Sequence, residues 1–93
     1  MDEALDFIRK WWPEAAERVI SACAAEKPFN GTQSEFLSHC TACGGNWGGM
    51  LLTGIKALFP RVYDAIPDNM GSQAFGCLCD TLVLLGVHGD EDC

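Results

Sequence analysis

The chain has 93 residues, of which 48% are apolar and 20% are charged, and its formal net charge is −7. This apolar content excludes a disordered acidic chain. The 13 acidic residues against six basic ones disfavour binding to nucleic acid or to anionic lipid, because both need clustered Lys and Arg. We expect a single helical domain over residues 1–93, which buries somewhat over ~60% of its unfolded surface.

The first six residues read Met-Asp-Glu-Ala-Leu-Asp, which is acidic where the positive segment of a secretory signal peptide would lie. The longest apolar run, residues 82–87, is far shorter than the ~20 residues needed to cross a bilayer. We therefore predict a cytoplasmic protein with no membrane partner, in which the cysteines are reduced thiols. A secreted scaffold held by disulfides is the alternative, and the several apolar helical stretches disfavour it.

Apolar residues recur at helical spacing along the whole chain, and no segment alternates as a strand does. Leu5, Ile8 and Trp12 predict a first helix from about residue 2. Pro13 then opens a second helix at its first turn, where a missing N–H costs nothing; one long helix kinked at this proline is the alternative. The second helix runs to about residue 26, before a turn that begins at Pro28.

A capping box marks the start of a third helix, because the hydroxyl of Thr32 and the carboxylate of Glu35 can each accept an otherwise unpaired backbone N–H. We expect this helix to run to about residue 43, before two glycines that end it. An asparagine at position 46 then caps a fourth helix over about residues 47–59, which ends at Pro60. Residues 61–66 are expected to add one or two helical turns.

The last helix, over about residues 72–86 with Asp68 or Ser72 as its cap, is apolar on nearly every side. Helices that are apolar all round are usually central. We therefore predict an all-α fold, a compact bundle of about five short helices with the C-terminal helix, residues 72–86, at its centre. Because 93 residues hardly surround a helix completely, we also expect a homodimer, built on this helix or on the N-terminal one.

Residues 40–49 form the most unusual segment, with two cysteines, four glycines and a tryptophan in ten positions. Cys40 and Cys43 are three positions apart, so on a helix both thiols can face one zinc ion, with Cys77 and His39 as further candidate ligands. The second pair is unfavourable, because Cys77 and Cys79 lie about 200° apart around a regular helix. We therefore expect no cofactor, and zinc is the alternative.

A thiol–disulfide function needs a thiolate of low pKa, which the N-terminus of a helix stabilises. Cys40 and Cys43 are expected at the opposite end of the third helix, which disfavours a thiolate. We therefore interpret the cysteines other than Cys93 as small, reduced core residues with no catalytic role, and we expect the terminal Cys93 to be exposed. The glycines that follow lack any phosphate-binding motif, so close helix packing is their better interpretation, and Gly54 in the middle of the fourth helix indicates the same close approach.

Trp11, Trp12 and Trp47 are the candidate interaction residues. Because Trp11 and Trp12 are adjacent on a helix, one can pack inward while the other faces about 100° away. An exposed tryptophan is typical of binding hot spots. The leading hypothesis is a small, non-catalytic cytosolic interaction or regulatory protein that binds a protein partner or a second copy of itself. The alternative is a metal-binding or thiol-redox protein centred on Cys40 and Cys43.

Overall fold

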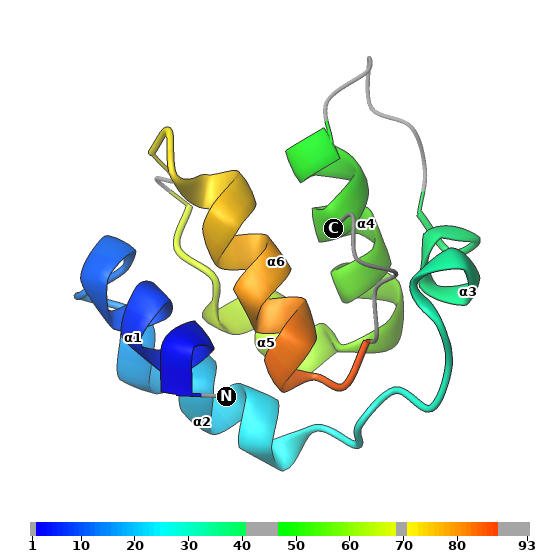
Figure 1. The fold of residues 1–93 in the computed structure, drawn as a ribbon, viewed down its shortest axis with the longest axis horizontal. Coiled ribbons are helices and arrows are strands. Elements are labelled where there is room, and N and C mark those ends of the chain that lie inside the picture. The colour runs from blue at the N-terminus through cyan, green and yellow to red at the C-terminus, as the bar shows by residue number, and fades with distance from the viewer. Residues whose placement is uncertain (1, 41–46, 69–70, 88–93) are drawn as a thin grey trace.

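The computed structural model describes residues 2–40, 47–68 and 71–87, and these ranges contain six α-helices and no strand. The helices are α1 (Asp2–Trp11), α2 (Ala16–Ala25), α3 (Gln33–Leu37), α4 (Trp47–Leu58), α5 (Pro60–Ala65) and α6 (Ala74–Leu84). Figure 1 shows α6 in the middle, between α1 and α2 on one side and α4 on the other, with α5 crossing behind it. The predicted all-α bundle is confirmed, and the turns expected around residues 61–66 form the short helix α5.

The apolar helix α6 contacts α1, α2 and α4, which explains why it has so few polar residues. Its fully buried side chains include Cys77, Leu78 and Leu82. Phe75 and Val83 remain 43% and 47% exposed, so the helix is central without being surrounded. In the described part of the chain, neither α6 nor any other helix is both long enough and apolar enough to cross a bilayer.

A glycine ends α6 in the way that helix chemistry favours. Gly86 has a φ of +82°, which glycine adopts without the clash that a side chain would cause. Its N–H donates to the carbonyl of Val83 at 3.1 Å, and the N–H of Val87 donates to the carbonyl of Leu82 at 3.0 Å. This pair of bonds is a Schellman motif, which satisfies carbonyls that the helix would otherwise leave unpaired.

The start of α6 differs from the prediction. The cap residue is Gln73, and no side chain caps the helix. Ser72 lies one position too early, and its hydroxyl donates to Oε1 of Gln73 at 2.9 Å. Neither Ser72 nor Asp68 is therefore the cap.

The junction between α1 and α2 also differs, because α2 begins at Ala16 and not at Pro13. Residues 13–15 form a turn in which the N–H of Ala15 donates to the carbonyl of Trp12 at 3.0 Å. The turn lets Trp12 and Ala15 both face the core, where they are 5% and 3% exposed. Burial of this large indole decides the path of the chain more strongly than the preference of proline for a first helical turn.

The third helix begins as predicted and ends earlier. The hydroxyl oxygen of Thr32 accepts a hydrogen bond from the backbone N–H of Glu35 at 3.2 Å. The carboxylate of Glu35 accepts a hydrogen bond from the Thr32 hydroxyl at 3.4 Å. In a capping box, this carboxylate would instead accept the backbone N–H of Thr32. The helix ends at Leu37, because the hydroxyl of Ser38 donates to the carbonyl of Glu35 and tightens the last turn. Cys40 therefore lies beyond the helix that was expected to carry it, and Cys43 falls outside the described residues.

Two side chains of the α2 segment hold α5 in place at its two ends. The backbone N–H of Arg61 donates to Oε1 of Glu26 at 2.9 Å, at the N-terminus of α5. At the other end, Nε of Arg18 donates to the carbonyl of Ala65 at 2.9 Å. A carboxylate at the N-terminus of a helix and a cation at its C-terminus are both favourable to the helix dipole. Helix α5 is therefore fixed against α2, and in the view of Figure 1 it lies behind α6.

Candidate functional site

The structure separates the three predicted interaction residues by exposure. Trp12 is buried in the core at 5% exposed, whereas its neighbour Trp11 is 38% exposed, as expected for adjacent residues on a helix. Trp47, the first residue of α4, is the most exposed of the three at 53%. Two of the three tryptophans therefore remain available at the surface.

A hollow of about 390 Å³ separates the N-terminal ends of α4 and α6. We call it the Trp47 hollow, and its lining residues are Trp47, Gly48, Gly49, Leu52, Gly71, Ser72, Ala74, Phe75 and Leu78. Because Gly48 and Gly49 carry no side chains, this turn of α4 leaves open space toward α6. Its two exposed rings, those of Trp47 and Phe75, make the hollow strongly aromatic.

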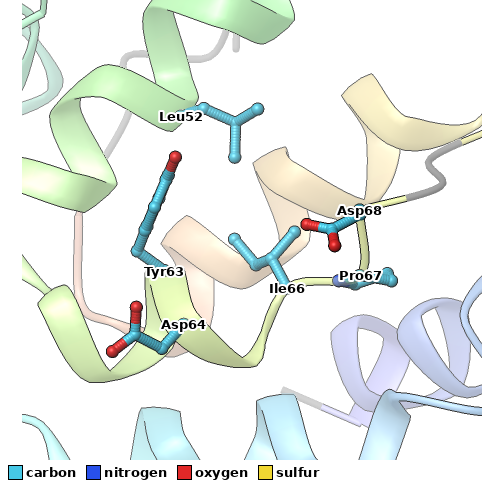
Figure 2. Close-up of a pocket in the computed structure, with 6 residues that line it drawn as sticks. All are labelled: Leu52, Tyr63, Asp64, Ile66, Pro67 and Asp68. Carbon is cyan, nitrogen blue, oxygen red and sulfur yellow. The ribbon is translucent and has the colours of Figure 1, made fainter.

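A second hollow of about 260 Å³, the Tyr63 hollow, lies between α4 and α5 (Figure 2). Its lining residues are Leu52, Tyr63, Asp64, Ile66, Pro67 and Asp68. Figure 2 shows the hydroxyl of Tyr63 directed toward Leu52, and the carboxylate of Asp68 directed toward the side chain of Ile66. The carboxylate of Asp64 is directed away from the other five residues. Asp68 is therefore the charged group that faces this space.

A third hollow of about 130 Å³, the Trp11 hollow, lies at the end of α1. Its lining residues are Trp11, Trp12, Pro13, Glu14, Ala15 and Pro67. Nε1 of Trp12 is buried and has no hydrogen-bond acceptor among the described residues. An unpaired buried donor costs roughly 1–3 kcal/mol, so the fold tolerates this penalty in order to bury the indole.

The three hollows are neighbours, because each shares a lining residue with the next, and we call the three together the groove. Leu52 lines both the Trp47 hollow and the Tyr63 hollow, and Pro67 lines both the Tyr63 hollow and the Trp11 hollow. The groove therefore runs from the exposed ring of Trp47 to the exposed ring of Trp11. Sequence reasoning identified the tryptophans at its two ends, but it missed Leu52 and Pro67, which join the hollows, because no local pattern indicates that they meet.

The candidate metal ligands do not gather into a site within the described residues. Cys77 is fully buried on α6, Cys40 is half-buried beyond α3, and His39 is exposed. In the described ranges, no three side chains among His, Cys, Asp and Glu come together in a way that could hold a metal ion. Cys43, the predicted partner of Cys40, and the terminal Cys93 lie outside these ranges.

Burial controls the acidity of the described thiols. It raises the pKa of Cys23 and of Cys77 to about 11, with smaller contributions from the charges of Glu26 and Asp80 respectively. Burial also raises the pKa of Cys40, against which a hydrogen bond from the backbone of Gly54 acts. A raised pKa keeps a thiol protonated at neutral pH, whereas thiol–disulfide exchange needs a thiolate. These three cysteines therefore have the properties of core residues.

Comparison of the chain with protein-family models, with curated protein sequences and with solved structures finds no match in any of the three. No residue's role can therefore be carried over from a relative. Function has to be inferred from the groove itself, from its exposed rings and from the charges along it.

Proposed function

We propose that this chain is a small, non-catalytic helical interaction protein of the cytoplasm, which binds another protein chain through the groove. The observation that carries the proposal is that three hollows lie next to one another, with Leu52 and Pro67 as shared lining residues and an exposed tryptophan in each of the two outer hollows. Tryptophan is strongly enriched at binding hot spots, and grooves between helices commonly accept the apolar face of a partner segment.

The exposed rings set the scale of the binding energy. Aromatic side chains present roughly 150–250 Å² each, so covering the exposed 53% of Trp47 and 43% of Phe75 removes roughly 200 Å² from water. At ~25 cal/mol per Å², this contributes about 5 kcal/mol. Association itself costs about 4–15 kcal/mol, so these two rings alone support only weak binding. Stable binding therefore also requires contacts in the Tyr63 hollow.

The cytoplasmic location in this proposal rests on the sequence, whose cysteines are interpreted as reduced thiols. The zinc or thiol-redox function centred on Cys40 and Cys43 is less favoured, because burial raises the pKa of the Cys40 thiol. Elemental analysis of anaerobically purified protein tests that alternative directly, and stoichiometric zinc or iron would support it.

Site-specific crosslinking tests the proposal, because α6 offers two matched exposed apolar positions. Phe75 lines the groove and is 43% exposed, whereas Val83 lines none of the three hollows and is 47% exposed. Each is replaced in turn by benzoylphenylalanine in the full chain, which is then irradiated in the producing cells. We expect a crosslinked partner protein from position 75 and none from position 83.

The partner is then purified and its affinity measured by calorimetry. Trp47→Ala should weaken binding about tenfold or more, and Val83→Ala should leave it within about twofold. Circular dichroism confirms that both variants keep the helical content of the wild type. Equal crosslinking from both positions, or unchanged affinity in Trp47→Ala, contradicts the proposal.

A further inference from the structure

The charged residues that line the groove are all acidic. Glu14 lines the Trp11 hollow, while Asp64 and Asp68 line the Tyr63 hollow. In the parts of the chain that the structure describes, no lysine or arginine lines any of the three hollows. The groove therefore combines one aromatic, apolar end with acidic residues in its middle and at its other end.

Among the described residues, none of these carboxylates forms an ion pair with a basic side chain. The single ion pair in residues 2–40, 47–68 and 71–87 joins Arg9 to Glu17, and neither residue lines the groove. Lys10 and Lys56 lie close by, with their ammonium groups 5.0 Å from the ring centroid of Trp11 and 5.5 Å from that of Tyr63. Both ammonium groups therefore lie over aromatic rings, and the carboxylate of Asp68 is directed toward the side chain of Ile66 in the hollow (Figure 2).

We propose, on the basis of the proposed function, that the occupant of the groove is a basic amphipathic segment of a different protein. Its apolar side chains lie between Trp47 and Phe75, and a lysine or arginine side chain reaches Asp68 beside Tyr63. The apolar contacts supply most of the affinity, because an exposed ion pair adds little by itself. The ion pair fixes which way the segment lies in the groove.

A second copy of this chain fits the groove less well than a basic segment does. Each copy carries a net charge of −7, so two copies repel one another at low ionic strength. In a symmetric dimer built on this groove, the acidic residues of one copy would also face those of the other. A basic segment gains from the same field, which accelerates its approach.

Peptide display tests the inference even while the partner is unidentified. A library of random 15-residue peptides is selected on the full-length protein and counter-selected on the Trp47→Ala/Phe75→Ala variant. We expect the enriched peptides to carry apolar residues together with lysine or arginine. Enriched peptides that are apolar and neutral or acidic overturn the inference, while their dependence on Trp47 and Phe75 leaves the proposed function standing.

Charge variants then test the position of the ion pair. For an enriched peptide, Asp68→Asn should weaken binding about two- to fivefold, and the loss should shrink as salt is raised to about 0.5 M. Asp64→Asn should have a smaller effect, because its carboxylate is directed away from the hollow. Asp6→Asn on α1, exposed and outside the groove, is the matched control and should have none.

Two further outcomes of these experiments also overturn the inference. One is an Asp68→Asn affinity equal to that of the wild type. The other outcome is that the protein binds no basic peptide and instead shows a monomer–dimer equilibrium in sedimentation, which Trp47→Ala abolishes. The occupant of the groove is then a second copy of this chain. If Trp47→Ala and Phe75→Ala leave binding of both peptide and crosslinked partner unchanged, the proposed function itself fails.

Discussion

Gly54 of α4 packs directly against the ring of Phe36 in α3. A Cβ at Gly54 would lie 2.6 Å from Cζ of Phe36 and 2.7 Å from Sγ of Cys40. Phe36 is fully buried, so its ring has no free space to move into. The absence of a side chain at residue 54 therefore allows α3 and the residues after it to approach α4, which is the close approach that a glycine in mid-helix predicts.

Gly54→Ala should destabilise the fold by ~1–3 kcal/mol, although alanine favours the helix by ~1 kcal/mol, because the added methyl overpacks a closed contact. Gly76→Ala on α6 is the control. There the Cβ would meet Cζ of Phe7 at 2.8 Å, but this ring is only half-buried and can move outward. The free energy of unfolding of Gly76→Ala should therefore stay within ~1 kcal/mol of the wild-type value. Urea unfolding followed by circular dichroism measures both, and equal midpoints for the two variants would contradict the packing argument.

Glu26→Ala should destabilise the protein by ~0.5–2 kcal/mol, the range found for loss of a helix cap, because Glu26 accepts the Arg61 N–H at the start of α5. Glu17→Ala is the matched control. Its ion pair with Arg9 is long, at 3.4 Å, and both side chains are largely exposed, so the change should stay within ~0.5 kcal/mol. Thermal unfolding of the two variants compares them directly. A larger loss from Glu17→Ala would show that Glu26 does not hold α5.

The buried thiols should make the protein less stable at alkaline pH. The pKa of Cys23 and of Cys77 is about 11 in the fold, against 9.0 without burial. The two protonated thiols therefore contribute fully to the free energy of unfolding below pH 9. This contribution is lost as the pH rises toward 11, because the thiols ionise at lower pH in the unfolded chain than in the fold. At about pH 10 we expect a loss of about 1 kcal/mol per thiol. Urea unfolding from about pH 8 to 10.5 should show a shallower decline for Cys23→Ala/Cys77→Ala, and identical slopes would refute this.

Asp80→Asn should stabilise the fold at neutral pH by under ~1 kcal/mol, since a partly exposed charge has a small effect. Burial raises the pKa of the Asp80 carboxyl, and the charge of Glu3 raises it further. The ionised form is therefore disfavoured in the folded state, and its penalty grows as the pH rises from the unfolded value of about 3.9 through the folded pKa. Unfolding curves at about pH 3.5 and pH 7 should show the advantage of the variant only at pH 7. An advantage of the same size at both values would mean that it has another origin.

Local chemistry explains which elements the sequence could predict. The spacing of apolar residues places the helices, and the start of α3 follows from the hydroxyl of Thr32 three residues before Glu35. The all-α class and the central position of α6 follow from the same patterns, because a helix that is apolar all round must be covered by others. Predictions that depended on competition between local and distant contacts failed. Pro13 is the example, since burial of Trp12 delays the start of α2 to Ala16.

Helical periodicity and residue type are properties of neighbouring positions, so they predicted the approximate helices and named Trp11, Trp12 and Trp47 as candidates, but not which of the three stay exposed. The exposure of Trp11 and Trp47, and their position in the two outer hollows of the groove, arise from tertiary packing. Leu52 of α4 and Pro67 after α5 join the three hollows, and no residue near either of them in the chain indicates that contact. The physical reason is that a groove is the space that packed helices leave between them, so it depends on how distant segments meet and not on the pattern within any one of them.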